Sequence, residues 1–322
     1  MAAVFIYFII DSRLFDIGDA DFGLDLTLAA LSVQLFIVCS FVLLAIRYVL
    51  LIGPPKVCLN ISLRSIILSL GLNLVLPGRL SELLKATYLR DHAAVPLSRG
   101  FSAIVLERLV DLMIVAVLGL IAVVNYFDQG SYSFMPVFGV MVAVVVMVAL
   151  RFQHLVLRVI GTLPSARLAG FLERAYRHFS ATARTQVFWQ ALLIGGLAWG
   201  MSCGSFLVFI NLAGSIPVGL SGALLVFVMT TLGGAIPALP GGLGTYEAAA
   251  VVALRSLGYG FDEALVLALA MHASQLILPF ILAIVIMMTE RVGISSLIAD
   301  LRRSAPATTG SGSGNEKGER GQ

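Results

Sequence analysis

The segment LPGRLSELLK, Leu76–Lys85, decides how this chain folds. Its Pro-Gly pair breaks an apolar run, and three charged residues follow the break. A similar segment, LPGGLGTYE, occupies Leu239–Glu247 far downstream. In both segments Leu-Pro-Gly is followed after a short gap by a glutamate that opens a new helix-like run. Pro-Gly pairs can simply mark turns between helices, but interruptions at matching places in two halves of a membrane protein are typical of a transporter's substrate site.

The composition excludes an ordinary soluble domain. Hydrophobic residues make up 59% of the chain and charged residues only 12%, about half the charge of a soluble domain. The sequence therefore predicts an all-α polytopic membrane protein with about six to eight transmembrane helices, two of its segments being broken, re-entrant hairpins. The three cysteines and four histidines are scattered, so we expect no cofactor and no metal site. The net charge of +3 gives no reason to expect a nucleic-acid partner.

Loop charges predict the topology of the N-terminal part. Residues 1–10 are apolar but too few to span a bilayer, so we expect them to be the C-terminal part of a first span whose beginning is missing or misassigned. The loop Asp11–Asp25 carries five aspartates, and Leu26–Leu51 is long enough to span. Arg47, Lys56 and Arg64 lie near or just beyond the far end of that span, which places this end in the cytoplasm and the acidic loop outside.

The first hairpin is predicted over residues 62–100. Ser65–Leu76 is apolar but short, and basic residues flank it on both sides. Both flanks should therefore be cytoplasmic, with the chain turning at Pro77-Gly78 inside the membrane. Non-helical backbone cannot face lipid, so this turn must be buried in protein or line a watery cavity.

The next span, Phe101–Asn125, contains a cluster of charges. Glu107 and Asp111 lie four residues apart and share one helical face, and Arg108 lies three residues before Asp111. Charged residues within spans are costly and usually face a pathway. The alternative is a self-neutralised ion cluster that only orients two helices.

Residues 126–133 are predicted as a short outer loop, and residues 134–150 return inward. The following segment, 151–186, is strongly basic and has apolar residues at helical spacing between Leu168 and Phe179. This pattern predicts an amphipathic helix on the cytoplasmic leaflet whose arginines attract anionic headgroups. The basic residues can equally act only as a topology signal.

Residues 187–212 are predicted to span outward, and residues 220–257 form the second interrupted segment. The order of inner and outer loops allows either a hairpin entered from outside or two tilted crossings. The hairpin would make the two halves inverted repeats. Ala264–Met288 is the last span and leaves the C-terminus inside. We expect one transmembrane domain over residues 1–303 and a disordered tail over 304–322, which is rich in Gly, Ser, Thr and charge.

At these motifs the sequence resembles the flippase-like family typified by the transmembrane region of lysylphosphatidylglycerol synthase. The first family motif appears as Asn73, Pro77, Gly78, Arg79, Ser81, Glu82 and Lys85. The second is Glu107, Arg108, Leu109 and Asp111; the third runs from Pro240 to Glu247; and the last is Ala268 with His272. The family more often has glycine in place of Ser81 and arginine in place of Lys85, and lysine cannot make arginine's bidentate phosphate contact.

The resemblance implies an inner-membrane lipid translocase for an anionic lipid, of the phospholipid or polyprenyl-phosphate type, without an enzymatic synthase domain. Arg79, Lys85 and Arg108 would take the headgroup phosphate, while Glu82, Glu107, Asp111 and Glu247 would balance the charge or carry a coupling proton. Helix N-termini after the two Pro-Gly turns would also offer N–H groups to an anion. The expected substrate-binding residues are Asn73, Pro77, Gly78, Arg79, Glu82, Lys85, Glu107, Arg108, Asp111, Pro240, Gly241, Gly242, Gly244, Glu247 and His272.

Two other functions stay open. The chain can be a non-transporting subunit that recruits a lipid-modifying or glycosyl-transfer enzyme through its basic inner loop. It can also be a membrane-embedded transferase that uses a carboxylate as base.

Overall fold

The computed structural model describes residues 20–53, 57–76, 80–126, 157–158, 160–162, 166–236 and 239–290. The expectations for residues 1–19, 127–156 and 291–322, and for the Pro77-Gly78-Arg79 turn, concern residues outside these ranges.

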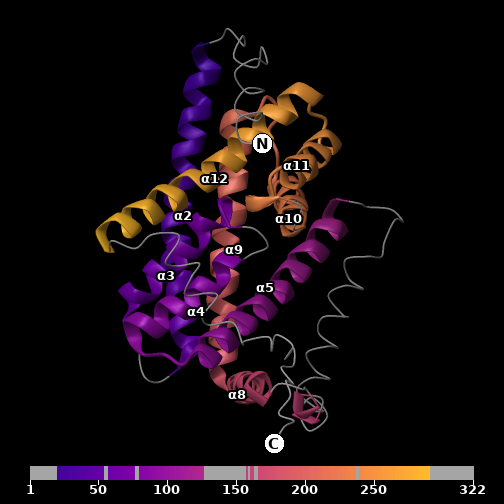
Figure 1. Ribbon diagram of the computed structural model, residues 1–322. Helices are drawn as coiled ribbons and strands as arrows, with labels where there is room; N and C mark the ends of the chain where they lie inside the picture. The colour runs from indigo at the N-terminus through magenta and orange to yellow at the C-terminus, as the bar shows by residue number, and fades with distance from the viewer. Residues whose placement is uncertain are drawn as a thin grey trace, which may run out of the picture.

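All regular structure in the described ranges is helical, as predicted (Figure 1). The elements are α2 (Ala20–Ile52), α3 (Leu59–Gly71), η2 (Leu72–Leu74), α4 (Leu80–Ala93), α5 (Leu97–Tyr126), α8 (Ala166–Thr182), α9 (Gln186–Ala213), α10 (Leu220–Ala235), η4 (Pro240–Gly242), α11 (Thr245–Ser256) and α12 (Phe261–Glu290). Among them, α2, α9 and α12 are long and apolar enough to cross a membrane. They expose large apolar side chains such as Leu35, Leu193 and Met288, as lipid-facing helices do.

Polar contacts define the two ends of the helix bundle. At one end Glu290, the last residue of α12, accepts hydrogen bonds from Arg64 of α3 at 2.8 Å and from Tyr88 of α4 at 2.6 Å. At the other end Glu263, near the start of α12, accepts bonds from Ser215, which lies just before α10. The first hairpin, α3–α4, therefore starts and ends at one end of the bundle, and the second, α10–α11, at the opposite end (Figure 1).

The two hairpins meet between these ends. Element η2 follows α3 and contacts η4, which connects α10 to α11. A Cβ added at Gly241 in η4 would lie only 3.1 Å from Leu74 Cδ1 in η2. In the second interrupted segment, α11 folds back on α10 at η4, and η4 lies beside η2 of the first segment. That both segments are re-entrant hairpins of an inverted repeat stays a prediction.

Small residues let the hairpins pack closely against their neighbours. A Cβ at Gly71 in α3 would lie 2.3 Å from the carbonyl oxygen of Pro279 in α12, and one at Gly233 in α10 would lie 2.5 Å from the carbonyl oxygen of Thr245 in α11. Helix α3 begins at Leu59, earlier than the expected start of the apolar arm at Ser65. The helix can include Arg64 because this side chain is 44% exposed and paired with Glu290.

Helix α8 is the amphipathic helix that the sequence indicated. It buries Ala175 and Phe179, and Phe171 packs against Phe101 at the start of α5 with ring centroids 5.6 Å apart. Arg177 on its other face is exposed and paired with Glu173. Its placement on the cytoplasmic leaflet stays a prediction.

Candidate functional site

A charged cavity of about 320 Å³ lies between the first hairpin and helices α2, α5 and α9. Its lining includes six ionisable side chains, namely Arg47, Glu82, Lys85, Glu107, Arg108 and Asp111, together with the polar residues Asn73, Ser81 and Trp199. These residues come from segments far apart in the sequence, and the helix packing described above brings them together.

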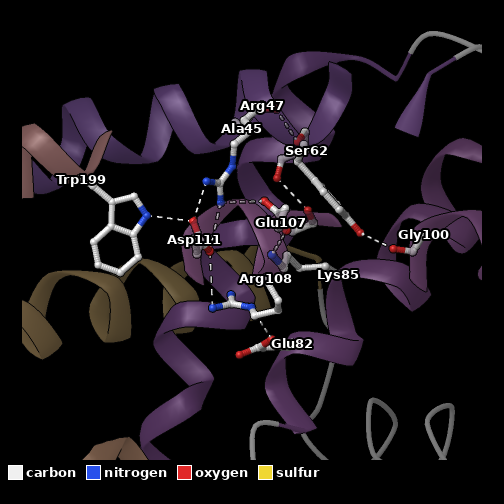
Figure 2. A network of polar contacts seen from close by, with 12 residues as sticks. Ala45, Arg47, Ser62, Glu82, Lys85, Gly100, Glu107, Arg108, Asp111 and Trp199 are labelled. Atoms are coloured by element: carbon white, nitrogen blue, oxygen red, sulfur yellow. Dashed lines mark hydrogen bonds and ion pairs between the residues drawn. The ribbon is translucent and has the colours of Figure 1, made fainter. Parts of the chain in front are cut away.

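The deepest charges form a network around one face of α5 (Figure 2). Arg47 of α2 donates to Asp111 Oδ1 at 2.6 Å and to Glu107 Oε1 at 3.4 Å. Lys85 of α4 lies 2.5 Å from the other Glu107 oxygen, and Trp199 Nε1 of α9 donates to Asp111 Oδ1 at 2.8 Å. The i, i+4 spacing of the two carboxylates thus lets one guanidinium bridge them, as a shared helical face predicts.

Burial separates these charges into two groups. The side chains of Arg47, Lys85, Glu107 and Asp111 are all less than 10% exposed. In contrast, Arg108 is 39% exposed and Glu82 19% exposed, with Arg108 Nε 3.0 Å from Glu82 Oε2. A buried ion pair must be matched on both sides because each unpaired charge is costly, so the inner group ties α2, α4 and α5 together. The Arg108–Glu82 pair is the more accessible part of the cluster.

A second cavity, of about 340 Å³, shares a wall with the first. Asn73, Trp199 and Gly234 line both cavities. The second contains mostly apolar and uncharged polar side chains, together with His272 of α12. His272 Nδ1 lies 2.8 Å from Glu247 Oε1 of α11, and its ring stacks on Tyr246 with centroids 3.9 Å apart.

The Pro240–Glu247 motif has a visible conformational role. Gly241, Gly242 and Gly244 have φ values of 70°, 75° and 86°, which only glycine adopts readily. The Gly244 N–H donates to Glu247 Oε2 at 2.6 Å, so the chain's own carboxylate caps α11. The Glu247 carboxylate therefore already accepts a hydrogen bond from one of the backbone N–H groups that were expected to bind an anion. A ligand role for these glycines stays a prediction.

A model of the family described as Lysylphosphatidylglycerol synthase TM region matches residues 2–283. The chain belongs to this family. No curated protein and no solved structure matches the chain. Family membership supports a membrane protein involved in lipid handling.

In this member of the family, the predicted site residues fall into two groups. Of the described ones, Asn73, Glu82, Lys85, Glu107, Arg108 and Asp111 line the charged cavity, and Asn73 and His272 line the second one. The others form the η4–α11 turn and line neither cavity, although Glu247 contacts His272; they are Pro240, Gly241, Gly242, Gly244 and Glu247. Pro77, Gly78 and Arg79 lie outside the described residues. Two details differ from expectation. Lys85 is 5% exposed and already paired with Glu107, so a phosphate would have to displace Glu107 to reach it. The closest partner of Arg108 is Glu82 at 3.0 Å, whereas Asp111 lies 3.6 Å away.

The sequence interpretation missed two members of the network, Arg47 and Trp199. Arg47 was taken only as a sign of the cytoplasmic end of its span, although it lies inside the apolar run. An arginine at that place is itself a signal for a buried partner. Gly195 of α9 leaves space for the Arg47 side chain, because a Cβ at this position would lie only 2.8 Å from Arg47 Nη1.

Proposed function

We propose that this protein binds the phosphate-bearing headgroup of a lipid in the charged cavity and moves that lipid between the leaflets of the inner membrane. It does so as a transporter without a cofactor, and not as an enzyme, with its C-terminus in the cytoplasm. The observation that carries this proposal is the partly exposed Arg108–Glu82 pair, set at a cavity whose other described charges are buried and mutually paired.

Arg108 is the residue assigned to the phosphate. Arg47 and Lys85 are almost fully buried and each contacts a carboxylate, so neither can turn toward a ligand without leaving a buried charge unpaired. Arg108 has more than a third of its side chain exposed, and its planar guanidinium suits a phosphate with two hydrogen bonds.

The described charges of the cavity balance, since Arg47, Lys85 and Arg108 face Glu82, Glu107 and Asp111. A phosphate must therefore compete with Glu82 for Arg108. Replacing Glu82 by Gln removes that competitor, and we expect a phosphate headgroup without an amine to bind up to about fivefold tighter. A headgroup that also carries an ammonium group would lose the Glu82 carboxylate as a partner in this variant, and it should bind to the variant more weakly than to wild type.

The experiment measures lipid movement and lipid binding by the purified protein. The protein is reconstituted into phosphatidylcholine vesicles that contain acyl-labelled fluorescent phosphatidylglycerol, and dithionite bleaching reports the lipid that reaches the outer leaflet. We expect Arg108→Ala to lower the initial rate about ten- to a hundredfold, the value of a charged hydrogen bond, and Arg108→Lys to restore it only in part. The matched control is Arg177→Ala, since Arg177 is an exposed arginine on α8.

Rapid lipid movement by Arg108→Ala, equal to that of Arg177→Ala, would contradict the proposal. If the wild-type protein moves no lipid but retains an enzyme during purification, the recruiting subunit becomes the better explanation. If it forms a modified lipid by itself, the transferase does. Both alternatives stay predictions.

A further inference from the structure

The second cavity contains a buried acid–base pair that the proposed headgroup site does not use. His272 is 5% exposed and Glu247 6% exposed. Both oxygens of Glu247 have a partner, because Oε1 contacts His272 Nδ1 at 2.8 Å and Oε2 accepts the Gly244 N–H at 2.6 Å. An intramembrane ionisable pair of this kind points to a function, because an apolar contact would hold two helices at lower cost.

The geometry selects the atom that exchanges a proton. A carboxylate only accepts hydrogen bonds, so His272 Nδ1 carries the hydrogen that faces Glu247. The other ring nitrogen, Nε2, is then the atom that gains or releases a proton, and His272 lines the second cavity. Histidine is the side chain best suited to exchange protons near neutral pH.

The surroundings leave this pair electrostatically isolated. Helices α9 and α10 carry no charged residue at all. Of the described ionisable side chains, Glu247 and Tyr246 of α11 contact the His272 ring. The other described charges on the elements around His272 are not among the residues that line the second cavity. They include the charges of the first cavity on α2 and α5, Asp25 of α2, Arg64 of α3, Arg255 of α11, and Asp262, Glu263 and Glu290 of α12.

We propose that His272 and Glu247 form a proton-binding site that couples a transmembrane proton gradient to lipid movement, an inference that rests on the proposed function. A proton from the second cavity adds to His272 Nε2 and converts the neutral imidazole into an imidazolium, which forms an ion pair with the Glu247 carboxylate. The same proton leaves from Nε2 when the site faces the other side, so the pair returns to its starting state.

A chain of contacts connects this pair to the headgroup site. Tyr246, next to Glu247, stacks on His272, and α11 packs tightly on α10. Phe227 of α10 meets the Trp199 ring edge-on at 5.6 Å, and Trp199 donates to Asp111 in the charged cavity. Protonation of His272 strengthens the contact between α11 and α12, and Trp199 carries the resulting shift of the second hairpin to the first cavity.

The test compares wild type with His272→Gln, which keeps a hydrogen-bond donor for Glu247 but cannot take up a proton. The matched control is His92→Gln, the same substitution at a partly exposed histidine at the end of α4. Dithionite bleaching in the same vesicles is recorded with and without a proton gradient of either sign. We expect the gradient to accelerate wild type and His92→Gln about tenfold and to leave His272→Gln unchanged, while phosphatidylglycerol binding at equilibrium persists in all three.

A second measurement keeps the outcomes separate. Histidine NMR of the lipid-free protein in detergent follows the His272 signal, assigned by its loss in His272→Gln, between about pH 5 and 8. No change of protonation there overturns the proton site, whatever the lipid assay gives. Lipid movement by His272→Gln that still responds to the gradient also overturns it. A titrating His272 in a wild-type protein that neither binds nor moves lipid overturns the proposed function and the coupling with it.

Discussion

Replacing Arg47 by Met tests the assignment of the inner charges to the fold. The Arg47 side chain is 2% exposed and contacts Asp111 at 2.6 Å and Glu107 at 3.4 Å. Removing one member of a buried ion pair usually costs about 3–5 kcal/mol because the other charge is left unpaired. Here Asp111 keeps the Trp199 N–H at 2.8 Å, and Glu107 keeps Lys85 at 2.5 Å. We therefore expect a loss near the lower limit, about 3 kcal/mol.

The measurement is unfolding of the purified protein by titration with SDS in mixed micelles. The double variant Arg47→Met with Asp111→Asn removes one charge of each sign and should recover most of the lost stability. The control is Arg177→Met, because the Arg177 side chain on α8 is 64% exposed and pairs with Glu173 at the surface. The unfolding free energy of this variant should stay within about 0.5 kcal/mol of the wild-type value. An Arg47→Met protein as stable as this control, or a double variant no better than the single one, would refute the structural role.

Three further predictions concern packing, pH and topology. Gly71→Ala should destabilise the protein by about 1–3 kcal/mol, because the new Cβ would lie 2.3 Å from a carbonyl oxygen of α12, whereas Gly196→Ala meets nothing within 4 Å and should be harmless in the same unfolding titration. Burial lowers the pKa of His178 below its usual 6.5, so the unfolded state binds more protons than the folded state. The packing of α8 should therefore weaken as the pH falls from about 6.5 toward the lowered pKa, and His178→Gln should remove this dependence in limited proteolysis. Cysteines at Ser81 and Thr245 should react with impermeant reagents only from opposite faces of the membrane, and access to both from one face would reject the inverted arrangement.

The fold was largely predictable because two strong signals decide it. Long apolar runs can only be helices in a bilayer, and a Pro-Gly break in a run too short to span favours a hairpin. The sequence could not choose between a hairpin and two crossings for residues 220–257, because both satisfy the same loop charges. That choice depends on contacts such as the one between Gly241 and Leu74, which periodicity does not reveal.

Some residues of the charged cavity could be identified from the sequence, but their pairing could not. Glu107, Arg108 and Asp111 were recognised because charges inside an apolar span are rare. Which cation serves which carboxylate depends on the distances between helices, so the roles of Lys85 and Arg47 could not be inferred. The space for Arg47 also depends on Gly195, which lies on a helix distant in the sequence. A glycine in an apolar run does not reveal which side chain of another helix packs against it.

The two halves of the chain use the same construction with different chemistry. In each half, the second arm of the hairpin bonds to the long helix that follows it, through Lys85–Glu107 in the first half and Glu247–His272 in the second. Both long helices begin near a Gly-Phe pair, and Asp111 lies ten residues after Phe101 whereas His272 lies eleven after Phe261. Under the proposed function, the ion-paired first half is suited to holding a charged headgroup and the histidine of the second half to exchanging a proton. The contact between η2 and η4 and the wall shared by the two cavities bring these two tasks close together.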